Sequence, residues 1–430
     1  MKKHEILPAA LTVSIFIVLF WAGFFFTDRM PFPVGIQSTV FYPLNALFHI
    51  MPYVPAFKTF FFLNMLLGAL FAFALARSYK LSVWAALLVS LVFTLNGRMN
   101  DRLESMNIFA ASAWLPLSVL AFKKFNEGGK TLWFFALAFS LAMQIFAGGA
   151  QIFLYAFIFL SLYTMYFAIT GKKWLKMSLF LLGAGLFALL FSAVLLLPYG
   201  GRYFDSPKAA GFNLSDAAGL SLPFSRLAGF IFPGCFGNSS VSSCIPAGKV
   251  QPLTALYCGF LPFIFAFFCG IDRKKPETLF YLASFLIFPF YALLGAVLPL
   301  AVLSGFGFDA LLKGAARKKQ ALVPKLPWLF FFLFFIMLIG AFLLYKPSCP
   351  GLFAVAALDA WAALAAAAGF LILFTLFRKK KIDKDVFALL IVLFIFTDLL
   401  FYGGRDNSIR REPERIGHTV LKAVDRGMRN

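Results

Sequence analysis

The sequence predicts an all-α polytopic membrane protein of about 13 transmembrane helices, with extracytoplasmic loops that carry short interfacial helices. Two observations predict this fold class. Of the 430 residues, 61% are hydrophobic and only 13% are charged, which is too little polar surface for a soluble chain of this length. Apolar runs long enough to cross a bilayer as helices also recur along the chain.

Each span needs about 20 apolar residues to cross about 30 Å of hydrocarbon as a helix. Pro289 and Pro299 interrupt the stretch 277–312, which could be divided differently. The first run is long and no A-x-A-like site precedes Thr27, so we expect an anchor that is not cleaved. Residues 1–403 therefore form one transmembrane domain, with spans near 7–26, 57–76, 81–97, 108–122, 131–148, 151–170, 177–198, 252–271, 277–293, 295–312, 327–345, 352–377 and 386–403.

The net charge of +21 is distributed in small basic clusters between the apolar runs, such as Lys123–Lys124 and Arg378–Lys381. A nucleic-acid-binding protein would gather its basic residues on one face or stripe, so we exclude that class. With the N-terminus in the cytoplasm, the short cytoplasmic segments hold more than half of the 39 Lys and Arg. Short basic loops face the cytoplasm and its anionic lipids, so this bias predicts the orientation. The tail 404–430 is then extracytoplasmic.

Three outer segments are candidates for function, namely 27–56, 96–107 and 199–251. The third is a loop rich in Gly, Pro and Ser whose apolar content argues against disorder, and loops this long are usually functional. Cys235 and Cys244 share that loop and could pair if it lies outside, although unpaired thiols are equally compatible with the sequence.

Common catalytic motifs are absent from the sequence. It contains no GxxxxGK[ST], HExxH or GxSxG pattern, and its three histidines supply little for His-based catalysis or metal binding. The GxG at Gly305–Gly307 lies in or beside a span and follows no strand, so we interpret it as a helix-packing or kink feature rather than a nucleotide loop.

Asp28 follows the first span by two residues, at the depth of the lipid headgroups. A carboxylate there could act as general base and take a proton from an acceptor hydroxyl while a lipid-linked donor docks beside it. The alternative is a solvated loop residue that marks the end of a helix.

The segment 96–107, NGRMNDRLESMN, holds the densest group of charges between two early spans. Arg98 and Arg102 are spaced i, i+4, and two guanidiniums at a membrane surface could clamp a phosphate or diphosphate. Asp101 and Glu104 are spaced i, i+3 and would share the neighbouring face of a helix. A local salt-bridge set that stabilises a turn explains these residues equally well.

Arg202 and Asp205 follow the seventh span, where Gly200 and Gly201 would let the backbone turn and bring Arg202 over the membrane face. A phosphate-binding role is possible for Arg202. Gln151 follows the Gly148–Gly149 turn at the start of a span, where a helix cap is the simpler interpretation.

Three acidic residues lie within spans, Asp309, Asp359 and Asp398. Acids in the membrane indicate function by default. All three lie toward the ends of the predicted spans, which weakens that interpretation. The sequence also shows no inverted repeat of the kind common in carriers.

The chain resembles the YfhO family of bacterial membrane proteins, which belong among the GT-C type glycosyltransferases. The residues that carry this resemblance are FYPLNALFHIMP at 41–52, Asn96–Gly97, AWLPL at 113–117, GGAQ at 148–151, LLLPYGGRYFDSP at 195–207, FSRLAGFIFPGCFGN at 224–238, YCGFLPFIFAF at 257–267, VLSGFGFDALL at 302–312 and TDLLFYGGRDN at 397–407.

The resemblance implies a GT-C-like fold in the bacterial cell membrane. It also implies a polyprenyl-phosphate sugar as donor, a cell-envelope glycopolymer such as a teichoic acid as acceptor, and an acid in the first outer loop as base, where Asp28 fits. Two departures stand against it. The first outer loop is short, and the chain ends where relatives continue into an extracytoplasmic domain, as a truncated or compact relative would.

We therefore carry three hypotheses. The first is an inverting glycosyltransferase in which Asp28 is the base and Arg98, Arg102 or Arg202 hold the donor phosphate, supported by Asp101, Glu104, Gln151 and Asp205. A divalent metal could assist, but the ligand set is too thin to assign one. The second hypothesis is a carrier or flippase for lipid-linked glycans. The third is a non-catalytic scaffold for envelope enzymes.

Overall fold

Every described element of this computed structural model is a helix, and no strand occurs in the described ranges, which are 3–22, 41–97, 99, 106–169, 174–204, 257–268, 276–287, 293–314 and 350–403. The helices in the first half are α1 (Lys3–Phe20), η1 (Pro43–Ala46), α3 (Leu47–Ile50), α4 (Tyr53–Ser78), α5 (Val83–Leu95), α7 (Met106–Ala113), α8 (Leu115–Gly128), α9 (Thr131–Phe146), α10 (Ala150–Ile169), α11 (Trp174–Phe191) and α12 (Ala193–Phe204). Those in the second half are α14 (Phe260–Phe268), α15 (Pro276–Ile287), α16 (Leu293–Gly314), α18 (Pro350–Arg378) and α19 (Lys384–Gly403).

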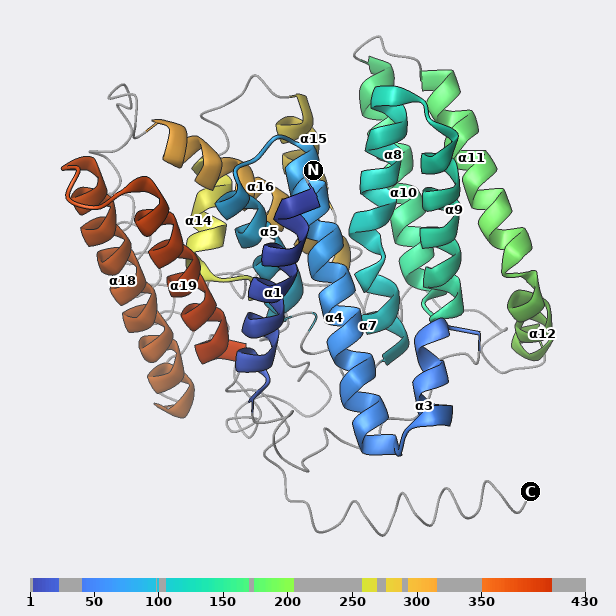
Figure 1. Ribbon diagram of the computed structural model, residues 1–430, viewed down its shortest axis with the longest axis horizontal. Helices are drawn as coiled ribbons and strands as arrows, with labels where there is room; N and C mark the ends of the chain where they lie inside the picture. The colour runs from blue at the N-terminus through green and yellow to red at the C-terminus, as the bar shows by residue number, and fades with distance from the viewer. Residues whose placement is uncertain are drawn as a thin grey trace.

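Most of these helices run alongside one another in a single bundle (Figure 1). Five helical stretches in the described part are long and apolar enough to cross a membrane: Tyr53–Ser78, Met106–Gly128, Trp174–Phe191, Ala296–Lys313 and Ala357–Arg378. The prediction of an all-α chain with membrane-spanning helices is confirmed at this level. Each predicted span overlaps a helix except the one near 327–345, which lies outside the described residues.

The centre of the bundle is formed by α5 and α16. Every residue of α5 from Ala85 to Leu95 is buried. At Gly305 of α16, a Cβ atom would lie 2.3 Å from the side chain of Val89, so only glycine permits this approach of α16 to α5. The interpretation of Gly305–Gly307 as a helix-packing feature is therefore confirmed for Gly305.

By contrast, α11 and α18 lie at the periphery. Only 33% and 29% of their apolar windows are buried, whereas 89% of the α16 window is buried. Their outward faces consist of large apolar side chains such as Leu179, Leu186 and Trp361. A helix that is apolar on both its inner and its outer face is suited to lipid rather than to water.

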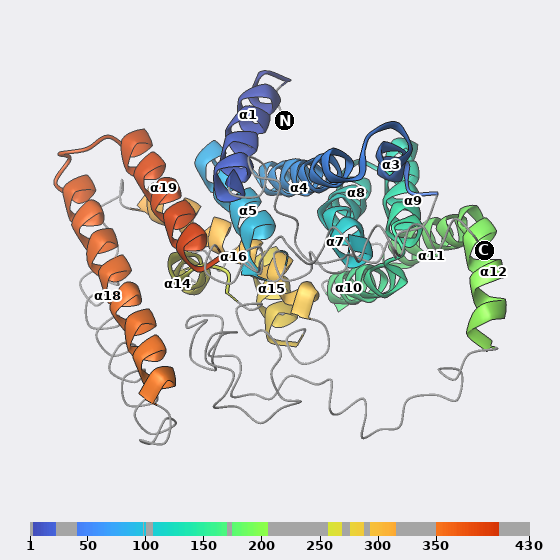
Figure 2. The same ribbon diagram turned by 90° about the horizontal axis from the view of Figure 1, so that it is seen from below.

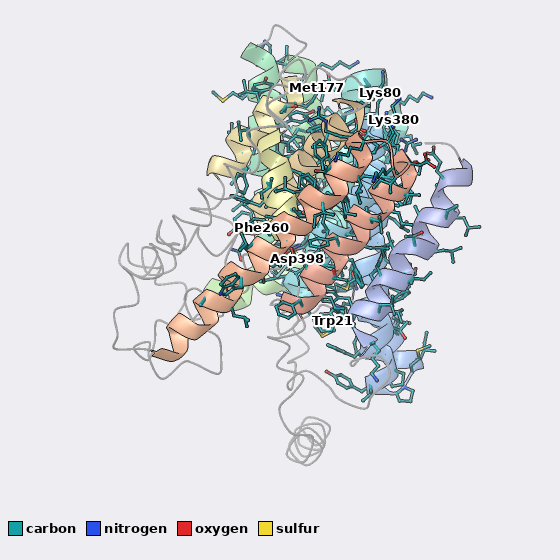
Figure 3. All side chains as sticks on the ribbon, turned by 90° about the vertical axis from the view of Figure 1, so that its left-hand side faces the viewer. Trp21, Lys80, Met177, Phe260, Lys380 and Asp398 are labelled. Atoms are coloured by element: carbon teal, nitrogen blue, oxygen red, sulfur yellow. The ribbon has the colours of Figure 1, made fainter. Side chains whose placement is uncertain are left out.

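The links α4–α5, α8–α9 and α18–α19 all lie at one end of the bundle, which we call the basic end (Figure 1). These links and the adjoining helix ends carry Arg77, Lys80, Lys123, Lys124, Lys130 and Arg378–Lys381. Figure 3 shows Lys80 and Lys380 at this end and Trp21 at the other, which we call the opposite end. The bundle is therefore strongly asymmetric in charge along its axis.

Side-chain contacts at the basic end connect helices that are distant in sequence. Arg77 at the end of α4 forms two hydrogen bonds from Nη2 to the Glu5 carboxylate of α1, at 2.7 and 2.9 Å. Asp309 of α16 accepts the backbone N–H of Ser82 at the start of α5 at 3.0 Å, and it also pairs with Lys313. Asp309 is thus explained as a residue that joins α16 to α5.

Near the opposite end, the predicted span 177–198 is interrupted. Helix α11 ends at Phe191, Ser192 is a turn, and α12 follows. Figure 2 shows α12 side-on although α8 and α10 are seen nearly end-on, so α12 runs across the bundle axis. The helix around 108–122 also changes direction locally, because α7 ends at Ala113 and α8 begins at Leu115 with Pro116 in its first turn.

Candidate functional site

Most residues that the sequence singles out for chemistry lie outside the described residues. They are Asp28, Arg98, Asp101, Arg102, Glu104 and Asp205. The loop cysteines Cys235 and Cys244 also lie outside the described residues. For Arg202 the backbone is described, within α12, but the side chain is not. The structure therefore describes the helix ends that adjoin the predicted site rather than the site itself.

The best-defined polar feature toward the opposite end is the start of α14. Residues 257–259 are not helical, and Gly259 has a φ of +94°, a value that side chains other than glycine rarely adopt. Asp398 of α19 faces this break (Figure 3). Its carboxylate accepts the Tyr257 hydroxyl at 2.6 Å and the Phe260 backbone N–H at 3.0 Å.

This carboxylate serves as the cap of α14. The first N–H groups of a helix have no partner within the helix, and a negative charge there is favoured by the helix dipole. In a lipid environment such unpaired groups would cost several kcal/mol each. Capping α14 therefore explains the presence of Asp398 in the membrane, where an acid would otherwise be taken to indicate function.

The same break is bound to the end of α5. The Gly97 N–H donates to the Tyr257 carbonyl oxygen at 2.7 Å. The amide of Asn96, which is fully buried, donates to the Phe93 carbonyl at 2.5 Å, and its Oδ1 accepts the Met99 N–H at 3.0 Å. We call Asn96, Gly97, Tyr257, Phe260 and Asp398 the α14 junction.

The α14 junction determines where the segment with the candidate arginines begins. Arg98 follows Gly97 directly in the sequence, and Asn96 caps both the end of α5 and the turn that follows it. Three helices, α5, α14 and α19, are thus joined at Gly97, the residue that precedes Arg98 in the sequence.

A second buried polar cluster lies between α4 and the α7–α8 turn. The Tyr42 hydroxyl donates to Asn64 Oδ1 at 2.5 Å and accepts the indole N–H of Trp114 at 3.0 Å. Burial raises the pKa of the Tyr42 hydroxyl well above its ordinary value, so this group remains neutral. The part of the first outer loop that contains Tyr42 is held to the bundle through this cluster.

The α9–α10 turn lies near the opposite end of the bundle as well (Figure 1). Gly148 has a φ of +83°, and its carbonyl oxygen accepts the Asn107 amide at 3.2 Å. A Cβ atom at Gly149 would come within 2.3 Å of Ala111, so the turn packs directly on α7. Gln151 is exposed, and its amide donates to the Tyr155 hydroxyl one turn later in α10. This bond is not a helix cap, because a cap accepts the first backbone N–H groups of the helix.

Arg202 lies apart from the α14 junction. Helix α12 packs against α11 and lies at the edge of the bundle, whereas α5 and α14 lie nearer its middle (Figures 1 and 2). Its backbone position thus gives no support to a single clamp formed by Arg98, Arg102 and Arg202 together. Arg98 and Arg102, which are four residues apart in the sequence, remain the preferred pair for a phosphate clamp.

The third intramembrane acid, Asp359 of α18, is buried. Within the described helices, no group of three or more His, Cys, Asp or Glu side chains is placed to hold a metal ion. Two of the three intramembrane carboxylates, Asp309 and Asp398, are engaged in helix pairing and helix capping.

Sequence reasoning missed Asn64, Asn96, Trp114 and Tyr257 as individual residues. A signal was present, because Asn64 and Asn96 are polar residues within or at the end of strongly apolar runs. Polar side chains in spans are expected to find partners on other helices.

The chain matches no protein-family model, no curated protein and no solved structure.

Proposed function

We propose that this protein is a membrane glycosyltransferase of GT-C-like architecture. It would transfer a sugar from a polyprenyl-phosphate donor to a cell-envelope glycopolymer, such as a teichoic acid, on the extracytoplasmic face of the bacterial cell membrane. The proposal includes about thirteen spans, with the N-terminus in the cytoplasm and the C-terminus outside. It also includes the resemblance to the YfhO family.

One observation carries this proposal furthest. Three short segments on which the resemblance rests, Asn96–Gly97, the segment starting at Tyr257 and the segment containing Asp398, meet by hydrogen bonds in the α14 junction. They are more than 130 residues apart along the chain. The proposal takes these segments as parts of one site, because hydrogen bonds join them although they are distant in the sequence.

The charge asymmetry supports the orientation. Short basic links are retained in the cytoplasm, so the basic end would be cytoplasmic. The C-terminal ends of α1 and α5 then point away from the cytoplasm (Figure 1). The segments that carry Asp28 and Arg98 follow these ends directly, so both would be on the extracytoplasmic side, where a lipid-linked donor and an envelope acceptor can meet.

In the proposed reaction, the acceptor oxygen attacks the anomeric carbon of the donor sugar as the bond from that carbon to the phosphate oxygen breaks. The Asp28 carboxylate takes the proton of the acceptor hydroxyl. Arg98 and Arg102 stabilise the negative charge that develops on the departing polyprenyl phosphate, where a preformed charge contributes most. Attack from the face opposite the phosphate inverts the anomeric centre.

The remaining candidates have secondary roles. Asp101 and Glu104 would orient the two guanidiniums, and Gln151 and Asp205 would contact sugar hydroxyls. Arg202 would bind a phosphate of the donor or of a surrounding lipid at the edge of the bundle. A divalent metal could assist the leaving phosphate, although the residues available form a thin ligand set.

The test is the substitution Asp28→Asn, expressed in cells that lack the protein, with envelope glycan decoration as the measurement. We expect decoration to fall to the level of cells without the protein. The matched control is Asp383→Asn, which makes the same chemical change at an exposed turn of the basic end. The control should leave decoration unchanged.

Arg98→Ala should also abolish decoration, and Arg98→Lys should restore part of it because the charge is kept but the two-pronged contact is lost. Full decoration with Asp28→Asn would show that the assigned base is wrong. In that case, a build-up of lipid-linked glycan on one leaflet in cells lacking the protein would favour the carrier. Loss of an envelope enzyme from the membrane in those cells would favour the scaffold.

A further inference from the structure

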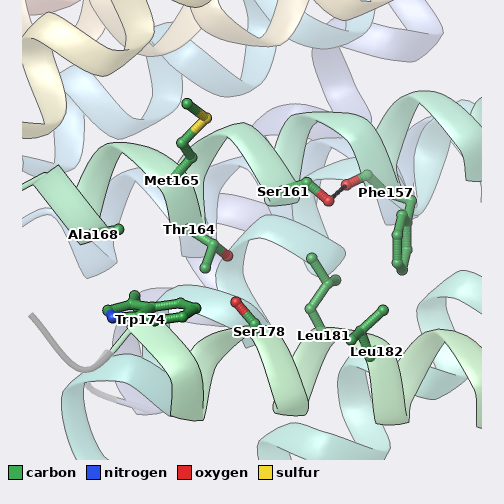
Figure 4. A pocket seen from close by; sticks show the side chains of 9 residues that line it. All are labelled: Phe157, Ser161, Thr164, Met165, Ala168, Trp174, Ser178, Leu181 and Leu182. Atoms are coloured by element: carbon green, nitrogen blue, oxygen red, sulfur yellow. Dashed lines mark hydrogen bonds between the residues drawn. The ribbon is translucent and has the colours of Figure 1, made fainter.

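A groove between α10 and α11 is lined on both sides by one face of each helix (Figure 4). It has a volume of about 340 Å³. The α10 face includes Phe157, Thr164 and Ala168, and the α11 face includes Trp174, Ser178 and Leu181. These residues recur at helical spacing, so the groove follows the length of the two helices rather than crossing them.

The groove has a closed end and an open end. At the closed end the helices touch, because a Cβ atom at Gly185 would come within 2.7 Å of the Phe157 ring. Ala168 and Trp174, which lie at the last turn of α10 and the first turn of α11, line the other end. That end of the two helices belongs to the basic end of the bundle (Figure 1).

The lining selects an apolar occupant. Thr164 and Leu181 are buried, while Met165, Trp174 and Leu182 on the rims are each more than half exposed. Two of the lining hydroxyls already donate within α10, Ser161 to the Phe157 carbonyl at 2.8 Å and Thr164 to the Leu160 carbonyl at 2.9 Å. These two hydroxyls therefore have no hydrogen left to donate to a ligand.

The surroundings indicate that the groove opens to lipid. Helix α11 is one of the five candidate spans, and only a third of its apolar window is buried. A methylene group occupies about as much space as a water molecule, about 30 Å³. The groove volume of about 340 Å³ therefore holds on the order of ten methylene groups of a chain. A groove that opens into hydrocarbon and stays empty would lose the contacts of its whole lining, so an acyl chain is the natural occupant.

The open end also suits a phospholipid headgroup. Trp174 lies where aromatic residues collect at membrane interfaces. The links and helix ends of the basic end are rich in Lys and Arg, so this end of the bundle would attract the phosphate of a headgroup. We propose that this groove is a binding site for one acyl chain of a phospholipid from the leaflet at the basic end, with the headgroup beside Trp174. This site is independent of the reaction proposed above.

The test measures the lipid that remains with the full-length protein after stringent detergent washing, by native mass spectrometry. The protein is reconstituted with defined phosphatidylglycerol and a polyprenyl phosphate in equal amounts before extraction. Wild-type protein should retain one phosphatidylglycerol. Ser178→Trp places an indole in the groove and should reduce this adduct to the background of non-specific adducts.

The matched control is Leu186→Trp, which adds an indole to the exposed face of α11 outside the groove and should retain the lipid as the wild type does. If Ser178→Trp disturbs folding, Ser178→Leu fills less of the groove and should retain an intermediate fraction. Equal retention by wild type and both Ser178 variants would overturn the proposal. Retention of the polyprenyl phosphate in place of phosphatidylglycerol would also overturn it, because the occupant would then be an isoprenoid chain.

Discussion

Replacing Asp398 by leucine is expected to open the start of α14. In the protein, this carboxylate accepts the Tyr257 hydroxyl at 2.6 Å and the Phe260 N–H at 3.0 Å. Leucine has a similar size but accepts neither bond. Two donors would then remain inside the bundle without their acceptor, and the non-helical residues 257–259 would lose the contact that holds them against α19.

The size of the effect follows from these two bonds. A buried donor left without a partner costs about 1–3 kcal/mol. Two terms reduce the sum, because the variant no longer buries a carboxylate and because the Phe260 N–H also lies 3.2 Å from the Tyr257 hydroxyl oxygen. Hydrogen bonds between membrane helices average only about 0.6 kcal/mol. We therefore expect a loss of roughly 2 kcal/mol, at the lower end of the simple sum.

Cys258 provides the assay. Its side chain is fully buried, is not in a disulfide and lies next to Tyr257 in the non-helical segment. With Cys235, Cys244, Cys269 and Cys349 replaced by serine, maleimide labelling in membranes reports how often this segment opens. A loss of about 2 kcal/mol corresponds to a roughly 30-fold faster labelling rate, since each 1.4 kcal/mol is a factor of ten.

Asp383→Leu is the matched control, because it makes the same change at an exposed turn before α19 and should leave the labelling rate of Cys258 unchanged. Tyr257→Phe removes one of the two bonds and should label at an intermediate rate. If Asp398→Leu labels as slowly as the wild type, then Asp398 does not hold the start of α14 and the reasoning is refuted.

Two further changes test the packing near the opposite end. Gly149→Ala should lower the thermal unfolding midpoint in detergent, because its Cβ would lie 2.3 Å from Ala111, and overpacking costs about 1–3 kcal/mol. Gly128→Ala, where no atom lies within 4 Å of the new Cβ, should not lower the midpoint, and an equal shift for both would contradict the packing argument. Tyr42→Phe should lower the midpoint by the equivalent of about 1–2 kcal/mol, since the Trp114 N–H and the Asn64 amide oxygen both lose their partner. A double variant with Trp114→Phe should then lose less than the sum of the single variants, and full additivity would show that the bond contributes nothing.

Much of the helical framework could be predicted from the sequence. The runs around 57–76, 131–148 and 352–377 are apolar over the length of a span, and α4, α9 and α18 occupy them with small shifts at the ends. Such runs are readable because a backbone in lipid must satisfy its own hydrogen bonds. The basic links were also readable, since charge at the ends of spans is a property of short sequence segments.

Features that depend on a distant partner could not be predicted in the same way. In the described part of the span expected at 252–271, residues 257–259 are not helical and the helix begins at Phe260, where Tyr257 is bound to Gly97 and Asp398. Nothing within the segment itself reveals these partners. The break at Ser192 is similar, because the run 177–198 remains apolar throughout and only the packing turns α12 across the bundle axis.

The candidate site was the part least accessible to sequence reasoning, and the α14 junction changes how it must be tested. The arginine segment begins at a peptide that is bound to Tyr257, and Tyr257 is bound to Asp398. A variant of Asp398 that loses decoration could therefore act by displacing the segment, without any contact between Asp398 and a substrate. Only a variant that abolishes decoration while Cys258 labels at the wild-type rate supports a direct role. Asp28→Asn and Arg98→Ala should meet that condition, because the described bonds at the start of α14 are formed by Gly97, Tyr257, Phe260 and Asp398.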